Sequence, residues 1–449
     1  MEVIDKRPYV GGASATISKK GCLADFGPHA MHIKDTRYGV IPFIRSFSGE
    51  KFVLKKRDIR MTIHNKILSH PLKIEEALFR LNPFLSAKIL YDYGITALKN
   101  RISEIPEDSF KAWGIKRFGP TLYDLFFGSY TEKVWGVPAE KLSVKLAQQK
   151  VSNINVIEII LHILGISKKF QKKYFDKFGY YEDGIGKIYE MIADKIRSMG
   201  VEIHTGTEIK DIHVKDNSVK EITFDKGGVE KKISCKELLS TIPLKYLVSY
   251  ISPKMDNEVI SKASSLRYRN LVLCNFIIGQ GSFTGSQWIY LLDKRFRFNR
   301  VSEQKNLSVK TAPEGKTVLS FEICCDYDDI WNSNEKELHD IAIKDLELLG
   351  VPRKKVDGFF SLRLEDAYPI YDLSFSENVA SVKDSLEKIR NLYIFGRQSL
   401  FLNNDMHDSM EMGFMLAEAL GKGINPEKWR DIMDSYTNNK LEGKEIKYV

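Results

Sequence analysis

The first sixteen residues contain a short apolar strand that ends in a carboxylate and leads into a glycine pair. The strand Glu2-Val-Ile-Asp5 ends in Asp5, and Gly11 and Gly12 follow. In a βαβ unit that binds a dinucleotide, an acidic residue at the end of the second strand holds a ribose hydroxyl, about 20 residues after a glycine-rich turn. Asp5 has the position of that acidic residue. The pattern predicts a Rossmann-like α/β fold with a dinucleotide ligand.

The glycine-rich turn of such a unit belongs before Glu2, and the sequence begins at Met1. We therefore expect about 30 residues, the first strand and helix of the unit, to be missing upstream. A mis-assigned start codon and a genuine loss would both explain this, and the sequence does not distinguish them.

Composition limits the class of protein. With 449 residues and 43% apolar content, the chain can bury a large core and divides into two or more domains. It has no apolar run of about 18 residues and no signal peptide, so we expect a cytoplasmic protein. The odd number of cysteines, without C-x-x-C spacing, argues against a disulfide framework or a zinc ribbon. The cysteines are Cys22, Cys235, Cys274, Cys324 and Cys325.

The net charge of +9 comes from lysine clusters that are scattered along the chain. Scattered clusters are typical of solvated helix faces, and no nucleic-acid-binding module accompanies them, so we expect no nucleic-acid partner. Attraction to an anionic substrate and peripheral contact with an anionic membrane both stay open. The oligomeric state is not indicated.

Periodicity predicts several elements. Residues 72–100 have helical apolar spacing that is broken at Pro83, which indicates a helical pair. A helix that ends at Gly200 and a strand over 201–204 follow later in the chain. Residues 267–350 are rich in strand-like runs, and 409–420 form a strong helix.

Several short segments, taken in order, resemble the flavin-containing amine oxidase superfamily. This group holds protoporphyrinogen-oxidase-like enzymes, carotenoid desaturases and, more distantly, UDP-galactopyranose mutases. The segments are Val3–Asp5 with Val10–Gly12, Asp25–His29, Ser129–Gly136 with Glu140–Ser143, Glu182–Gly186, Glu208–Ile209, Ser240–Pro243, Ala367–Pro369 and Asn391–Arg397 through Gly413. Each segment is weak evidence alone, but their order and spacing indicate the superfamily.

The resemblance implies FAD as the cofactor and a discontinuous FAD-binding domain with an inserted α+β substrate domain. The expected boundaries are 1–50, 170–245 and 355–425 for the FAD-binding domain, 51–169 and 246–354 for the substrate domain, and 426–449 for a C-terminal tail.

The cofactor-binding candidates combine residue chemistry with this resemblance. Glycines let the backbone approach a pyrophosphate. A helix that begins near Met406 would direct its N-terminus at the flavin and stabilise the anionic reduced ring. The local order Met406-His407-Asp408-Ser409 departs from the family's usual Met-Asp-His-Ser. The candidates are Asp5, Gly11, Gly12, Gly27, Pro28, His29, Ile209 (through its backbone), Gly396, Arg397, Met406, His407 and Ser409.

No catalytic residue is assigned, because flavin chemistry needs no acid–base triad. His29 and His32 are spaced like metal ligands, but no third ligand follows, so no metal is predicted. Arg300 could hold an anionic group of the substrate, and a surface salt bridge would explain it equally well. The substrate-pocket candidates are Tyr130, Trp135, Trp288, Tyr290, Arg300 and Tyr368, although aromatic residues are just as typical of a core.

The functional prediction is an FAD-dependent oxidoreductase that transfers a hydride from a C–H bond of a small-molecule substrate to flavin N5. The first alternative is a UDP-galactopyranose mutase-like flavoenzyme that uses reduced flavin to rearrange a nucleotide sugar. The second alternative is a shortened, non-catalytic binding protein, because a missing glycine-rich loop would remove the anchor of the pyrophosphate. The substrate and the electron acceptor cannot be predicted.

Overall fold

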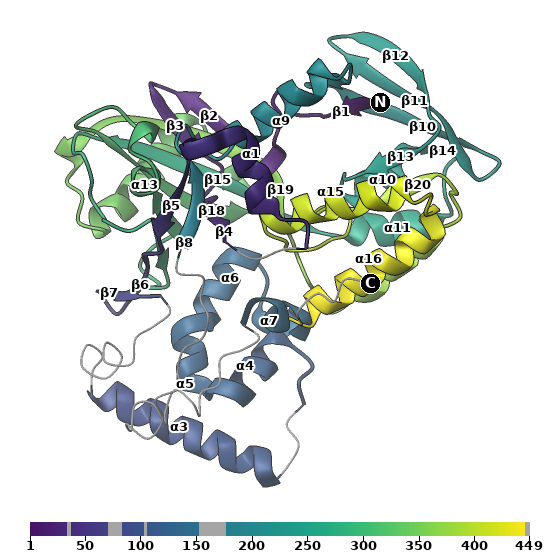
Figure 1. The fold of residues 1–449 in the computed structure, drawn as a ribbon. Helices are drawn as coiled ribbons and strands as arrows, with labels where there is room; N and C mark the ends of the chain where they lie inside the picture. Colours follow the sequence, from purple (N-terminus) through teal and green to yellow (C-terminus); the bar gives the residue numbers. More distant parts are fainter. Residues whose placement is uncertain (34–36, 71–82, 103–105, 152–176, 445–449) are drawn as a thin grey trace.

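A computed structural model of the chain describes residues 1–33, 37–70, 83–102, 106–151 and 177–444. Its largest element is a seven-stranded sheet, and a group of helices extends from one end of that sheet (Figure 1). In spatial order the strands are β19 (Val356–Pro369), β15 (Tyr268–Ile278), β18 (Thr317–Cys325), β17 (Arg300–Glu303), β16 (Trp288–Leu291), β6 (Ile59–Ile63) and β7 (Lys66–Ser69). The strands pair antiparallel except β16 with β6.

The centre of this sheet is buried on both faces. Every residue of β15 and of β18 is buried, which suits their nearly unbroken apolar sequences. The helix α13 (Glu335–Leu348) packs on β15 and β19 and covers one face. The sheet is therefore a rigid floor that can hold polar side chains in fixed positions.

Parallel strand pairs also occur outside the seven-stranded sheet. The strand β1 (Glu2–Ile4) pairs with β9 (Glu202–His204), and β13 (Leu238–Ser240) pairs with β20 (Leu392–Ile394). The smaller sheets comprise β2 (Thr16–Lys19) with β3 (Cys22–Asp25), β4 (Met31–His32) with β8 (Lys177–Tyr181) and β5 (Phe52–Lys56), and β12 (Val229–Ser234) with β11 (Ser218–Lys226), β10 (Glu208–Lys215) and β14 (Ile251–Ser252). This arrangement, with an inserted domain of helices and antiparallel sheet, confirms the predicted α/β fold class.

Helices surround these sheets. Those of the lower group in Figure 1 are α3 (Pro83–Ile102), α4 (Phe110–Phe118), α5 (Pro120–Tyr123), α6 (Ser129–Trp135) and α7 (Val144–Val151). The others are α1 (Val40–Ser48), α9 (Lys187–Ser198), α10 (Leu244–Tyr250), α11 (Asn257–Ser265), α12 (Asp329–Asn332), α14 (Phe375–Leu386), α15 (Met406–Gly421) and α16 (Pro426–Leu441).

Most predicted elements are present, with one correction. The helix α3 begins at Pro83, α9 ends just before Gly200, and β9 follows at Glu202. The first helix predicted in 72–100 falls mainly on residues outside the described ones. The range 267–350 is not all strand, because it includes α13, which begins with a capping box formed by Asn334 and Glu337.

The C-terminal range 426–449 begins with the packed helix α16. Trp429 is fully buried, and its indole Nε1 donates to the carbonyl of Ile394 at 3.1 Å. The domain boundaries stay a prediction. All five cysteines are free thiols. None of the helices in the described ranges is long and apolar enough to cross a membrane.

Candidate functional site

The turn after β3 is held by a buried hydrogen-bond network around Asp25. The Asp25 carboxylate accepts from Thr16 Oγ1 at 2.5 Å and from Tyr180 OH at 2.7 Å, and the Gly186 amide donates to Thr16 Oγ1 at 2.8 Å. Burial raises the pKa of Asp25 to about 7, although these hydrogen bonds oppose the shift. The network joins β2, β3 and β8 to the loop before α9, and so holds the following turn, 26–29, in place.

A buried ion pair lies beside this turn. On the neighbouring strands β17 and β18, the guanidinium of Arg300 donates to both carboxylate oxygens of Glu322, at 2.8 and 2.6 Å. The Glu322 side chain is fully buried and that of Arg300 is 17% exposed. The alternative of a surface salt bridge for Arg300 is therefore wrong. Gly27 has φ +123°, and a Cβ there would lie about 3.5 Å from the Glu322 carboxylate, in ordinary contact.

Four aromatic candidates gather around this ion pair. The Arg300 Nη2 lies 3.4 Å from the Tyr368 hydroxyl, and the guanidinium carbon lies 6.0 Å from the Tyr290 ring centre. The ring of Tyr130 meets that of Tyr290 edge-on at 5.8 Å, and the ring of Trp135 meets that of Tyr368 at 6.1 Å. Five of the six substrate-pocket candidates are thus in one cluster, to which we refer as the Arg300 cluster.

The sixth candidate, Trp288, differs. It packs on Phe178, with ring centres 5.0 Å apart, in an apolar cluster that also includes Met406. Its indole Nε1 is buried and has no hydrogen-bond partner among the described residues. Trp288 is therefore mainly a core residue, and Tyr290 of the Arg300 cluster packs against the same apolar cluster.

Arg397 connects the end of β20 to the Arg300 cluster. Gly396 has φ +86°, which a side chain would disfavour, and it turns the chain into Arg397. The Arg397 guanidinium donates to the carbonyls of Asn404 at 2.5 Å and Ala367 at 3.0 Å, and its carbon lies 5.5 Å from the Tyr368 ring centre. Its position is therefore set by backbone groups and not by a carboxylate.

His29 is buried close enough to both arginines for their charges to act on it. Burial, together with the charges of Arg300 and Arg397, lowers the pKa of His29 to about 3. The imidazole is therefore neutral near pH 7. Its Nδ1 is buried and finds no hydrogen-bond partner among the described residues.

The N-terminus of α15 lies near His29, because the charge of its cap residue Asp405 acts on that imidazole. Asp405 and Asp408 form a capping box there. Asp408 also accepts from Lys440 Nζ at 2.5 Å and lies 3.3 Å from His407 Nε2, so His407 is engaged within the α15–α16 contact. Ser409 Oγ donates to the Asp405 carbonyl at 3.4 Å. The predicted residues His407 and Ser409 thus take part in the helix cap.

The remaining cofactor candidates lie at the end of the β1–β9 pair. The Asp5 carboxylate accepts from the Arg7 amide at 2.8 Å, and the Asp5 amide donates to the His204 carbonyl at 2.8 Å. Gly11 has φ +91°, and a Cβ there would lie 3.2 Å from Tyr189. Ile209 lies on β10, where a bulge follows it. An apolar cluster containing Ala13, Phe26 and Tyr368 connects this group to the Arg300 cluster.

The described residues include unpartnered buried polar atoms and a glycine turn, and both fit a dinucleotide ligand that carries a polar ring. Buried polar atoms without a protein partner in the described residues include His29 Nδ1, both amide atoms of Asn404 and Ser399 Oγ. Buried polar groups are normally satisfied, so a polar ligand would remove this deficit. The positive φ at Gly11 and Gly12 suits a turn against a pyrophosphate.

Sequence reasoning missed Glu322. One signal was available: Glu322 is a lone carboxylate in the apolar run of β18, and a buried carboxylate requires a cationic partner. Its partner could not be identified without the strand register.

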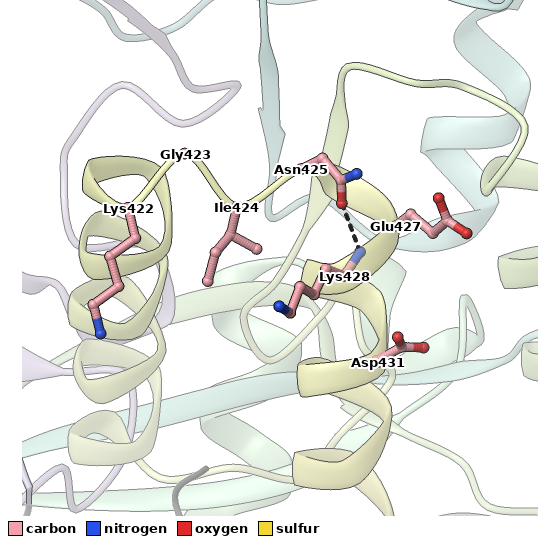
Figure 2. A pocket seen from close by; sticks show the side chains of 7 residues that line it. All are labelled: Lys422, Gly423, Ile424, Asn425, Glu427, Lys428 and Asp431. Carbon is pink, nitrogen blue, oxygen red and sulfur yellow. Dashed lines mark hydrogen bonds between the residues drawn. The ribbon is translucent and has the colours of Figure 1, made fainter.

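A separate hollow lies at the turn between α15 and α16 (Figure 2). It is lined by Lys422, Gly423, Ile424, Asn425, Glu427, Lys428 and Asp431. Asn425 Oδ1 accepts from the Lys428 amide at 2.9 Å and so caps α16. All of these residues except Ile424 are exposed. Because no buried polar group faces it, this hollow has no feature of a catalytic site.

Comparison with known proteins agrees with this geometry. The profile of the family described as "Flavin containing amine oxidoreductase" matches residues 1–368. A crystal structure of reduced UDP-galactopyranose mutase is similar, with a TM-score of 0.82 and 18% identity, over 98% of this chain and 93% of that one.

Two further structures are similar over most of their length. A putative protoporphyrinogen oxidase from Exiguobacterium sp. 255-15 has a TM-score of 0.65 and 15% identity, over 91% of this chain and 92% of that one. Cyclohexylamine oxidase from Brevibacterium oxydans IH-35A has a TM-score of 0.60 and 10% identity, over 93% of both chains. The chain thus belongs to the flavin-containing amine oxidoreductase family and is an FAD-dependent oxidoreductase.

Proposed function

We propose that this chain removes a hydride from a C–H bond of a polar, oxygen-rich small molecule and that the Arg300 cluster binds that substrate. The observation that carries the proposal is the ion pair between Arg300 and Glu322, which is surrounded by tyrosines beside Gly27 and His29. A paired, buried guanidinium with hydroxyl groups around it is suited to orienting hydroxyl and carbonyl oxygens.

The charge of the site argues against a protonated amine as substrate. Glu322 is neutralised by Arg300 and His29 is held neutral, so the charges that remain near His29 are the Arg397 guanidinium and the Asp405 carboxylate, which caps α15. A cation brought beside the guanidinium groups of Arg300 and Arg397 loses hydration, and the carboxylates near it are already engaged with Arg300 and with the α15 cap. Neutral and anionic substrates are therefore favoured.

The cofactor is assigned to the remaining candidates. We propose that Asp5 binds the ribose, that Gly11 and Gly12 approach the pyrophosphate, and that the Ile209 backbone contacts the adenine. At the other end, residues 27–29 and 396–397 and the N-terminus of α15 would surround the flavin ring. FAD supplies the hydride acceptor when it is bound. The protein's own contribution is to orient the substrate, exclude water and keep His29 uncharged.

A second candidate function is a mutase-like rearrangement of a nucleotide sugar, which needs reduced flavin and no net electron acceptor. It is supported by the structural similarity to UDP-galactopyranose mutase over almost the whole chain. The Arg397 guanidinium would also suit the diphosphate of such a substrate.

An anaerobic spectral experiment tests both. The FAD-loaded protein is mixed without oxygen with hydroxy acids and alcohols, and separately with nucleoside diphosphate sugars, while absorption near ~450 nm is followed. Loss of this band on addition of a hydroxyl compound supports hydride removal. The mutase is supported if only the dithionite-reduced protein converts a nucleotide sugar and if the oxidised protein keeps its absorption band. A chain that binds no FAD under any condition would be a non-catalytic binding protein, and both proposals would be wrong.

A further inference from the structure

The helix α3 has an apolar stripe on its exposed side. Its twenty residues include Tyr91, Ile95, Leu98 and Ile102, which are 67, 37, 57 and 77% exposed. These positions are separated by four, three and four residues, so they follow one face of the helix. Isolated exposed apolar residues are normal on a protein surface, but a continuous stripe along a helix marks a contact surface.

The opposite side of α3 is already in contact with the protein. Asn100 Nδ2 donates to the carbonyl of Lys116 on α4 at 2.9 Å, and Thr121 on α5 donates to the carboxylate of Asp92. Gly119 approaches the α3 backbone so closely that a Cβ there would lie 3.2 Å from Asp92. The orientation of α3 is therefore set by its inner side, and the apolar stripe is directed outward by the fold.

Cationic side chains of α3 lie on both flanks of the stripe. On a helical wheel Lys88 lies on one flank of the stripe and Arg101 lies on the other, and both are exposed. The single carboxylate in α3, Asp92, is on the inner side and accepts from Thr121. The exposed side of α3 is thus apolar along its middle and cationic on both flanks.

We propose that the exposed side of α3 docks on the surface of an anionic lipid bilayer. Apolar and aromatic residues between cationic flanks are the pattern of helices that lie in the plane of a membrane interface. A second copy of this chain would bring the same cations together, with no carboxylate of α3 to neutralise them. The membrane supplies both the apolar phase and the negative charge.

The position of α3 in the molecule suits this contact. In Figure 1 the helix lies at the lower extremity, and the described sheets all lie on one side of it. At about 1.5 Å per residue, its twenty residues form a rod of about 30 Å, which could rest on a flat surface along its whole length. The net charge of +9 would add attraction to anionic lipid at longer range.

The test is co-sedimentation of the full FAD-loaded chain with two kinds of vesicle. One kind contains phosphatidylcholine alone, and the other contains about 30% phosphatidylglycerol as the anionic lipid. We expect binding to the anionic vesicles, weaker binding at high salt, and at most weak binding to the neutral ones. The double variants Tyr91→Glu/Leu98→Glu and Lys88→Glu/Arg101→Glu should each lower the affinity about tenfold or more.

Two matched controls change the same chemistry elsewhere. Leu373→Glu changes an apolar side chain that is 60% exposed, and Lys231→Glu/Lys236→Glu reverses two exposed charges near β12. Both should bind vesicles like the parent protein. Folding of every variant is checked by bound-flavin absorption and thermal unfolding.

Three results would overturn the proposal: no vesicle binding by the parent, equal binding to neutral and anionic vesicles, or equal loss in the control variants. Sedimentation velocity tests whether a second copy of the chain covers the stripe instead. If the parent is a dimer that binds no vesicles, and Tyr91→Glu/Leu98→Glu makes it monomeric, the stripe is a dimer contact. None of these outcomes depends on whether the enzyme proves to be an oxidase or a mutase.

Discussion

Arg300 and Glu322 are direct cross-strand neighbours on β17 and β18, and their side chains form two parallel hydrogen bonds inside the sheet. Burial by itself would lower the pKa of Arg300, but the Glu322 carboxylate and the nearby tyrosines hold it well above its usual value. The pair therefore stays ionised, and its geometry is fixed by strand register.

Removing one partner of this pair should be costly. Glu322→Gln leaves the Arg300 charge buried without a counter-charge, so we expect the free energy of unfolding to fall by about 3–5 kcal/mol. Urea unfolding of the FAD-loaded protein measures this. The matched control is Glu347→Gln, because Glu347 makes a similar two-bond pair with Arg353 on the surface, where solvent screens the charges and the loss should be much smaller. Equal losses in the two variants would contradict a buried ionic pair.

The carboxyl of Asp25 should make stability depend on pH in an unusual direction. Its pKa is raised from 3.8 to about 7 in the folded protein, so the folded state binds the proton more tightly than the unfolded state. Its contribution is therefore complete at and below about pH 4 and is lost as the pH rises to about 7, with a limiting slope of ~1.4 kcal/mol per pH unit.

Comparison with Asp25→Asn isolates this contribution. The variant lacks the ionisation, so its free energy of unfolding relative to the parent should increase as the pH rises from 4 to 7. Urea unfolding at half-unit pH steps measures the difference. A constant difference across this range would show that Asp25 titrates normally.

His29 should not titrate near neutral pH. Because burial and the two arginines lower the pKa of His29 to about 3, its imidazole stays neutral from pH 5 to 8. NMR of protein labelled with ¹³C-histidine, with His29→Gln used to assign the signal, measures this directly. An imidazole signal for His29 that shifts with a midpoint near pH 6.5 would contradict the buried position close to the arginines.

The glycine turn offers a test of the proposed pyrophosphate contact. Gly11→Ala introduces a Cβ at φ +91° and 3.2 Å from Tyr189, whereas Gly21→Ala introduces one at φ +74° with no atom within 4 Å. Both substitutions should cost about 1–2 kcal/mol of stability through backbone strain. Only Gly11→Ala should weaken FAD binding, by about tenfold, as measured by quenching of flavin fluorescence. Equal FAD affinities in the two variants would remove Gly11 from the cofactor site.

Thiol reactivity should follow burial. Four of the five cysteines are buried, and only Cys235 is partly exposed. Burial raises the pKa of Cys274 well above its usual value and that of Cys324 to about 12, so these thiolates are scarce as well as inaccessible. In the native protein Ellman's reagent should modify at most one thiol, and Cys235→Ser should abolish this reaction. All five thiols of the parent should react in denaturant.

Local sequence signals predicted the elements that depend on a few adjacent residues. The β1 strand with Asp5, the glycine turn, α9 with its end at Gly200 and the start of α15 at Met406 all follow from residue types a few positions apart. Family resemblance, carried by short segments in order, predicted FAD and the fold class for the same reason. Each of these features depends on residues that are close together in the sequence.

The tertiary structure decided the partners of those residues. Arg300 was a candidate from sequence, but only the pairing of β17 with β18 shows that Glu322 holds it. The sequence likewise places apolar residues along α3, but the packing of its other side on α4 and α5 determines that Tyr91, Leu98 and Ile102 face outward. Such relations join residues far apart in the chain, and they depend on strand register and helix orientation, which local residue preferences do not specify.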